Sequence, residues 1–120
     1  MQEWLWATAA DLGRRIDVGE IDPVDLCEMY LAAIVAHPMR DRIYARVTVD
    51  RARGEAAAAS VRAKAGQRLS PLDGVPVSWK DLFDTAGVAT EAGTKLMKGR
   101  VPTTDAEVLF TATSMGLVCL

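Results

Sequence analysis

Histidine and cysteine are scarce in this sequence. It has one histidine, His37, and two cysteines, Cys27 and Cys119, which lie far apart in the chain. None of the three has a companion at the spacing of a metal-ligand motif, so the sequence predicts neither a metal site nor a disulfide framework. We expect no metal and no cofactor. Both cysteines should be ordinary buried thiols, because free cysteine is among the most buried residue types.

Long apolar runs and a charge excess are missing as well. No hydrophobic stretch approaches the ~20 residues that a membrane-spanning helix needs, and the first ten residues lack the regions of a secretory signal peptide. We therefore expect a cytoplasmic chain without a membrane partner. The formal net charge of -2 provides no broad positive field. Direct binding of nucleic acid is not expected, because such binding depends on neutralising phosphates.

The remaining composition is typical of a folded protein. Hydrophobic residues make up 50% of the chain and charged residues 25%, which argues against disorder. A chain of 120 residues is long enough to bury a core. The natural interpretation is one domain, or part of one, in which 1–40 form N-terminal helices and 41–120 begin an α/β core.

Helix signals dominate the first forty residues. Thr8 and Asp11 form a capping box for a first helix, which Gly19 should end. Asp22-Pro23 combines an N-cap with proline at the first helical position and predicts a second helix. Pro38 should end this helix near His37.

After the second helix, the spacing of apolar residues changes from a helical period to an alternating one. Apolar and polar residues alternate over 43–49, which predicts a half-buried strand. Asp50 can cap a third long helix, which runs through alanines to Lys64 and ends before Gly66. The cluster 70–74 has turn chemistry.

The second half of the chain reads as strand, loop, helix and strand. Val75–Lys80 alternates like a short strand, and 81–103 is irregular and longer than most connections. A capping box of Thr104 and Glu107 predicts a helix that ends near Gly116. The sequence stops inside the apolar run 117–120, so we expect a truncated polypeptide. The order of elements predicts an α/β fold with helices packed on the sheet faces.

Lys80 is the most informative candidate for chemistry. It follows an apolar strand and precedes a glycine-bearing loop, the place where sites gather in α/β folds. A desolvated lysine amine holds its proton less tightly than one in water and can serve as a base toward a hydroxyl nucleophile. The alternative is a surface lysine that is solvated or paired with Asp81.

Three segments, in order, resemble the amidase signature family. Residues 71–88 are similar to the family's lysine segment and read PLDGVPVSWKDLFDTAGV. Residues 90–94 (TEAGT) resemble its T-x-A-G-S loop, and 101–106 (VPTTDA) its P-x-x-D-A stretch. The N-terminal helix pair also resembles the family's opening, so the likeness covers nearly the whole chain.

This resemblance implies an N-terminal portion of a mixed-sheet amidase-signature fold that hydrolyses a carbon-nitrogen amide bond. Family chemistry uses a serine nucleophile and a relay serine that passes protons to a lysine, and Lys80 matches that lysine. Both family serines lie in a serine-rich stretch that this chain does not reach, so we expect the chain alone to be inactive. The substrate would be a small-molecule amide. Three residues depart from the usual pattern: Asp73, Trp79 and Glu91.

Three further residues are candidates for the pocket or its surroundings. Ser78 shares the strand face of Lys80 by period-two geometry and reads mainly as a small polar residue near the site. Asp81 can orient the lysine or satisfy backbone donors, with a plain surface or capping role equally open. Thr94 stands where the family often has serine, with a turn-forming role as its alternative.

Three functions remain open from the sequence. The first is a plain amidase. The second is the glutamine-hydrolysing component of a tRNA-dependent glutamine amidotransferase, its A subunit, which passes the released ammonia on. The third is a non-catalytic truncated product or binding segment. Partner subunits and ammonia transfer would separate the first two, and the sequence leaves the oligomeric state undetermined.

Overall fold

The computed structural model describes residues 2–120 and begins with two helices in the predicted places. After a 3-10 turn, η1 (Gln2–Trp6), helix α1 (Ala9–Asp17) starts at Thr8, whose hydroxyl accepts the N–H of Asp11 at 3.1 Å. Helix α2 (Pro23–Ala36) starts at Asp22, whose carboxylate accepts the N–H of Val24 at 2.9 Å. Both predicted N-caps are confirmed.

The predicted strand over 43–49 is wrong. A short helix, α3 (Arg40–Ile43), occupies its start, and the chain then runs without regular structure to Thr48. Within the described part of the chain no strand pairs with this segment, and a strand needs a hydrogen-bonded partner. The alternation does not match burial either, since Ile43 and Ala45 are exposed. Tyr44 and Val47 pack against the core from the irregular segment, and Val49 does so from the first turn of the helix that follows.

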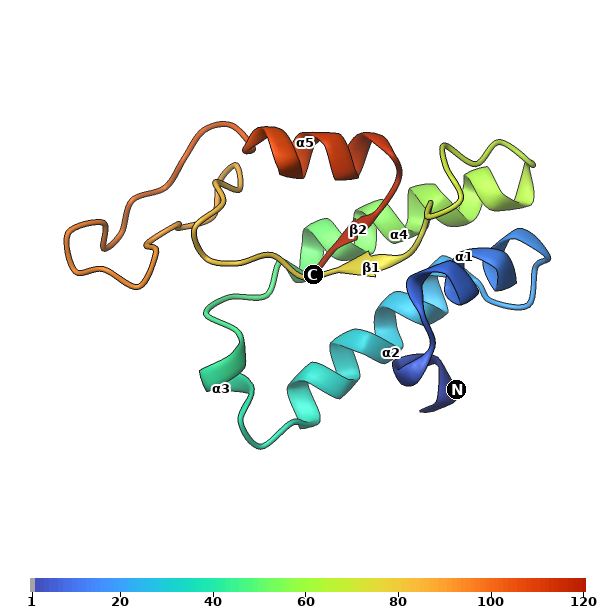
Figure 1. Cartoon of the computed structure of the whole chain (residues 1–120), viewed down its shortest axis with the longest axis horizontal. Helices are drawn as coiled ribbons and strands as arrows, with labels where there is room; N and C mark the ends of the chain where they lie inside the picture. The colour runs from blue at the N-terminus through green and yellow to red at the C-terminus, as the bar shows by residue number, and fades with distance from the viewer. Residues whose placement is uncertain (1) are drawn as a thin grey trace.

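Helix α4 (Val49–Lys64) follows and lies behind the sheet in Figure 1. Its N-cap is Thr48, so the predicted cap at Asp50 is wrong by two residues, and Asp50 lies in the first turn, where its charge favours the helix dipole. The buried side of α4 carries small residues, which let α2 approach closely: Ala52, Ala56, Ala59 and Ser60.

Two short parallel strands form the sheet. Strand β1 (Pro76–Val77) pairs with β2 (Val118–Cys119) in the register Pro76 to Val118 and Val77 to Cys119. Parallel neighbours need a crossover connection. Here it consists of the long irregular segment after β1 and helix α5 (Glu107–Ser114). Figure 1 shows that segment extending away from the sheet and returning to α5. The predicted α/β class is confirmed.

Helix α5 starts later than its sequence suggests. The capping box of Thr104 and Glu107 does not form, because the N-cap is Ala106 and makes no side-chain cap hydrogen bond. Tertiary contacts hold the entry instead: the N–H of Ala106 donates to the carbonyl of Asp84 at 2.8 Å. The predicted end at Gly116 is confirmed, since the helix stops at Ser114 and Gly116 has a φ of +87°.

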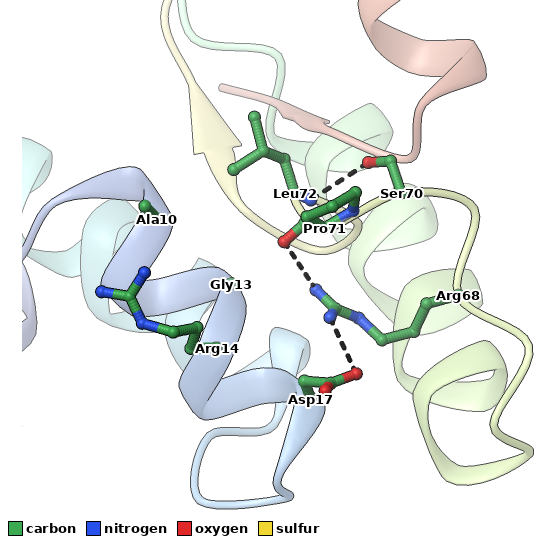
Figure 2. Close-up of a pocket in the computed structure, with 8 residues that line it drawn as sticks. All are labelled: Ala10, Gly13, Arg14, Asp17, Arg68, Ser70, Pro71 and Leu72. Carbon is green, nitrogen blue, oxygen red and sulfur yellow. Dashed lines mark hydrogen bonds and ion pairs between the residues drawn. The ribbon is translucent and has the colours of Figure 1, made fainter.

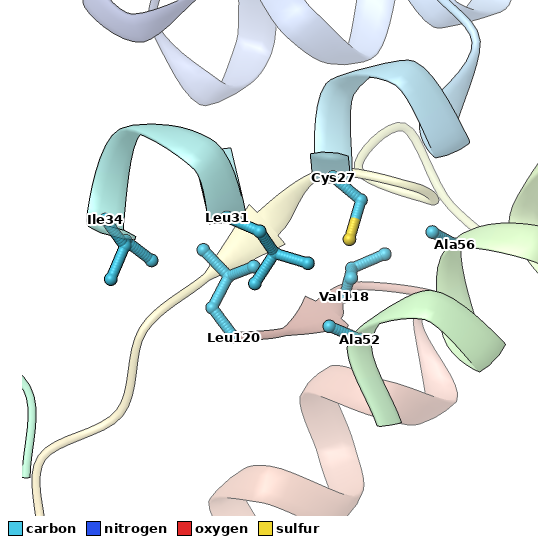
Figure 3. Packing of buried hydrophobic residues seen from close by; sticks show 7 residues of the cluster. All are labelled: Cys27, Leu31, Ile34, Ala52, Ala56, Val118 and Leu120. Atoms are coloured by element: carbon cyan, nitrogen blue, oxygen red, sulfur yellow. The ribbon is translucent and has the colours of Figure 1, made fainter. Parts of the chain in front are cut away.

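The core lies between the helices and one face of the sheet. Figure 3 shows side chains of α2 and α4 directed toward β2 and the residue after it: Cys27, Leu31, Ile34, Ala52, Ala56, Val118 and Leu120. A second cluster joins α1 and α2 to residues just before α2 and just before β1: Leu12, Ile16, Ile21, Leu26 and Val75. Both cysteines are buried and free, as predicted. Over residues 2–120, no helix is long and apolar enough to cross a membrane.

Candidate functional site

A cavity of about 520 Å³ lies beyond the carboxyl ends of both strands. Its walls come from three parts of the chain: residues within 41–48, residues within 78–93, and the pair Cys119 and Leu120. Crevices outside the carboxyl ends of parallel strands are the usual ligand sites of open α/β sheets. The fold therefore brings the predicted lysine segment to a position suited for binding.

Lys80 lines this cavity, but its side chain is exposed. The expectation of a desolvated amine is not met within residues 2–120. Across the same residues the amine makes neither an ion pair nor a hydrogen bond; in particular it does not pair with Asp81. The catalytic role of Lys80 stays a prediction.

Ser78 lines the cavity from the same segment and is held by a partner from the irregular segment after α3. Its hydroxyl lies 3.0 Å from the phenol oxygen of Tyr44, close enough for a hydrogen bond. Tyr44 also packs against the core, which anchors this contact. Ser78 is thus engaged with Tyr44 rather than with Lys80, which agrees with a supporting position near the site.

Asp81 is half-buried and binds two groups. Its Oδ1 accepts a hydrogen bond from Arg46 Nη1 at 3.2 Å and another from the N–H of Glu91 at 3.2 Å. Arg46 also forms an ion pair with Glu91. The Asp81 side chain therefore satisfies a backbone donor of the loop, one of the roles expected from the sequence.

Thr94 does not line the cavity. Its hydroxyl donates to the carbonyl of Glu91 at 3.2 Å and accepts the N–H of Met97 at 3.3 Å, so its contacts lie within its own loop. The neighbouring Ala92 and Gly93 contribute to the cavity wall instead. The geometry fits the turn-forming role that the sequence left open for Thr94.

Trp79 lines the cavity between Ser78 and Lys80, and its indole Nε1 is buried without a hydrogen-bond partner among the described residues. Buried indole N–H groups usually have an acceptor. The bulk of this side chain, a departure from the family pattern, thus falls on the cavity wall.

A second cavity, of about 440 Å³, lies between α1 and the turn before β1 (Figure 2). Arg68 crosses it, donating to Asp17 at 3.2 Å and to the carbonyl of Pro71 at 3.1 Å. The serine in its lining, Ser70, donates to the carbonyl of Met115 at 2.7 Å and accepts the N–H of Leu72. These groups are used in holding the turn, so we place the candidate site at the larger cavity beside Lys80.

Sequence reasoning missed two residues of the candidate site, Tyr44 and Arg46. Their partners are 34 residues away for Tyr44 and 35 and 45 residues away for Arg46. No short motif marks such pairs. The one available signal was the presence of Glu91 inside the T-x-A-G loop, because a carboxylate there needs a cation or backbone donors once it is partly buried.

Comparison with known proteins identifies the family. The sequence profile of the Amidase family matches residues 25–120, so the chain belongs to the amidase signature family. It is 41% identical over 108 residues to the A subunit of the glutamyl-tRNA(Gln) amidotransferase of Anaeromyxobacter dehalogenans, covering 90% of this chain and 22% of that relative. It is 37% identical over 120 residues to the same subunit of Thermobifida fusca, covering 100% of this chain and 24% of that relative.

Solved structures agree with this family. The native peptide amidase from Stenotrophomonas maltophilia superposes with a TM-score of 0.85 at 32% identity, covering 95% of this chain and 24% of that protein. Fatty acid amide hydrolase, at 18% identity and a TM-score of 0.80, shares the fold. The expected amidase-signature fold is confirmed. The chain spans about a quarter of the length of these relatives. The share is 22% for the Anaeromyxobacter dehalogenans subunit and 24% for both the Thermobifida fusca subunit and the peptide amidase.

Proposed function

We propose that this chain supplies the lysine-bearing part of an amidase that hydrolyses a carbon-nitrogen amide bond. The observation that carries the proposal is the position of Lys80, at a cavity beyond the carboxyl ends of β1 and β2, within the segment that matches the family. A small-molecule amide as substrate and a cytoplasmic location belong to the same proposal. The chain would be the partial domain expected from its sequence, with further residues completing the sheet and the site.

In the proposed reaction, Lys80 is the final proton acceptor. A serine hydroxyl loses its proton to a second serine, which passes a proton to the neutral Lys80 amine, while the first serine oxygen attacks the amide carbonyl carbon. The C–N bond then breaks, the leaving nitrogen takes a proton, and water hydrolyses the acyl-enzyme. Both serines would lie outside residues 1–120. Closure of the cavity by substrate and by the rest of the protein would desolvate the amine, which is exposed in this chain.

Turnover of a simple aryl amide by the complete gene product tests this proposal. Lys80→Ala should lower kcat roughly 10²–10⁴-fold, the usual contribution of a general acid-base group. Lys95→Ala is the matched control, because it removes another exposed lysine outside the cavity lining. The isolated 120-residue chain should show no turnover. Equal activity of wild type and Lys80→Ala would refute the catalytic role and favour a non-catalytic binding segment.

A second candidate function is that of an amidotransferase component. The similarity to the A subunit of glutamyl-tRNA(Gln) amidotransferases over 90% or more of this chain supports it. Glutamine hydrolysis that requires partner subunits, with the released ammonia passed to an acyl acceptor, would distinguish this function. Partner-independent turnover of aryl or peptide amides, with no ammonia transfer, would favour the plain amidase.

A further inference from the structure

Arg46 lies between two carboxylates at the wall of the cavity that holds Lys80. Its Nη1 donates to Asp81 Oδ1 at 3.2 Å and its Nη2 donates to Glu91 Oε1. The three side chains are partly shielded from water, with exposed fractions of 30% for Arg46, 28% for Asp81 and 23% for Glu91. Partly buried ion pairs are screened by salt and water less than surface pairs. The two ion pairs of Arg46 should therefore stabilise this part of the structure.

Backbone groups extend this cluster across the cavity wall. Asp81 Oδ1 also accepts the N–H of Glu91 at 3.2 Å, and Glu91 Oε2 accepts the N–H of Gly99 at 3.2 Å. Arg46 therefore ties the segment before α4 to the residue that follows Lys80 and to the loop around 90–99. Arg46 is 35 residues from Asp81 and 45 from Glu91 in sequence, and residues of all three segments line the cavity.

The same contacts determine which charges are free near the lysine. The charged residues that line the cavity are Lys80 together with Asp41, Arg42, Arg46 and Asp81. Glu91 is not among the lining residues and forms an ion pair with Arg46. A free carboxylate at Asp81, next to Lys80 in the chain, would attract the protonated amine and oppose its role as a base. With Arg46 bound to Asp81, that attraction is offset.

We propose that Arg46 is a positioning residue for Lys80, which holds the carboxylate of Asp81 away from the amine and joins the cavity segment before α4 to the segment after β1. The inference rests on the proposed function, because positioning Lys80 matters only if Lys80 is the base. The effect of Arg46 on protonation of the Lys80 amine does not itself require catalysis. It can therefore be measured in the absence of catalysis.

Competitive acetylation of lysines as a function of pH, read by mass spectrometry, tests the inference on the 120-residue chain. Lys95 in the same sample is the internal reference. In Arg46→Gln, the pH at which Lys80 is half-labelled should rise by about one pH unit, because Asp81 is released. In Arg46→Gln/Asp81→Asn it should return to the wild-type value. An unchanged Lys80 profile in Arg46→Gln, or a shift that persists in the double variant, would overturn the inference.

Two further variants guard against simple structural explanations. Arg53→Gln removes the Arg53–Glu28 pair between α4 and α2, which has similar chemistry but lies outside the cavity lining, and should leave the Lys80 profile unchanged. If circular dichroism shows that Arg46→Gln does not fold, the Lys80 labelling profile of Asp81→Asn tests the inference instead. It removes the carboxylate next to Lys80 while Arg46 stays paired with Glu91, so half-labelling should move to lower pH. No movement would contradict the inference.

Activity of the complete gene product gives an independent readout. The acidic limb of the kcat profile should move to higher pH in Arg46→Gln and remain near wild type in Arg46→Lys, which keeps the charge. KM should change less than kcat, because Arg46 acts on the base. If neither wild type nor any variant turns over amides while the labelling shift occurs, the proposed function fails and the positioning role of Arg46 stands.

Discussion

Arg51 holds Asp105 through two side-by-side hydrogen bonds, Nη1 to Oδ1 at 3.0 Å and Nη2 to Oδ2 at 2.8 Å. Asp105 also accepts the N–H of Ala86 at 2.8 Å. On the other side, Arg51 Nε donates to Glu55, whose second oxygen accepts the N–H of Cys119 at 2.7 Å. One arginine of α4 thus connects the long loop, the entry to α5 and the end of β2.

Loss of this arginine should destabilise the fold. Arg51→Gln leaves Asp105 and Glu55 without their cation although both are largely shielded, with exposed fractions of 20% and 24%. We expect the free energy of unfolding to fall by about 2 kcal/mol, between the effects of exposed and fully buried pairs. Urea unfolding measures it. Arg53→Gln, which removes the more exposed pair with Glu28, should change the midpoint little, and equal losses in both variants would contradict this assignment.

The same contact makes stability depend on acid. Hydrogen bonding from Arg51 outweighs burial and holds the pKa of Asp105 below its ordinary value of 3.8. Because the folded-state pKa is the lower one, the contribution of Asp105 is fully present above the unfolded pKa and is lost as pH falls through the folded pKa. Wild type should therefore lose more stability than Asp105→Asn between about pH 5 and the acid limit. Parallel curves of unfolding free energy against pH for the two proteins would exclude this role.

Features that depend on a few neighbouring residues were predictable from the sequence. The caps at Thr8 and Asp22 and the helix end before Gly116 are local, since each involves neighbouring residues only. The entry to α5 was mispredicted because a contact with Asp84, distant in sequence, holds it. Alternation over 43–49 was misread because a strand needs a hydrogen-bonded partner, which this segment lacks within residues 2–120. Tertiary packing instead exposes Ile43 and Ala45 and brings Tyr44 to the core.

In the candidate site, too, local features were predictable from the sequence and contacts between distant residues were not. Lys80 was found through its local motif, and its place at the cavity follows from that motif's position after β1. The contacts of Arg46 with Asp81 and Glu91 depend on how the chain folds back over 35 and 45 residues, which no local spacing encodes. The exposure of Lys80 likewise depends on which segments cover the cavity, a tertiary property.

Gly116 should tolerate no side chain. It has a φ of +87°, and a Cβ built there would lie 2.3 Å from an oxygen of Asp73, which is 1% exposed and bound by Arg62 at 2.8 and 2.7 Å. Gly116→Ala should cost about 3 kcal/mol of unfolding free energy, from backbone strain and displacement of a buried ion pair. Gly66→Ala is the matched control: its φ is +65° with open space around it, so strain alone should cost about 1 kcal/mol. Similar urea midpoints for the two variants would contradict the close contact with Asp73.

Both thiols should be inert in the folded chain. Burial raises the pKa of Cys27 to about 11, and burial also raises the pKa of Cys119. At about pH 8 the thiolate fraction of Cys27 is then roughly 10²-fold below that of a free cysteine. A disulfide reagent should modify neither residue until guanidinium chloride unfolds the chain. Rapid modification of one thiol under native conditions would show that its side of the core opens.

Lys80 should matter to chemistry and not to folding. Its side chain is exposed and makes neither an ion pair nor a hydrogen bond within residues 2–120, so Lys80→Ala should change the free energy of unfolding by less than about 0.5 kcal/mol. Asp81→Ala should cost about 1 kcal/mol or more, since it removes the acceptor for Arg46 and for the N–H of Glu91. Thermal or urea unfolding of the 120-residue chain compares the two. A large loss in Lys80→Ala would mean that the lysine supports the fold, and an inactive Lys80→Ala enzyme could then no longer be taken as evidence for a proton acceptor.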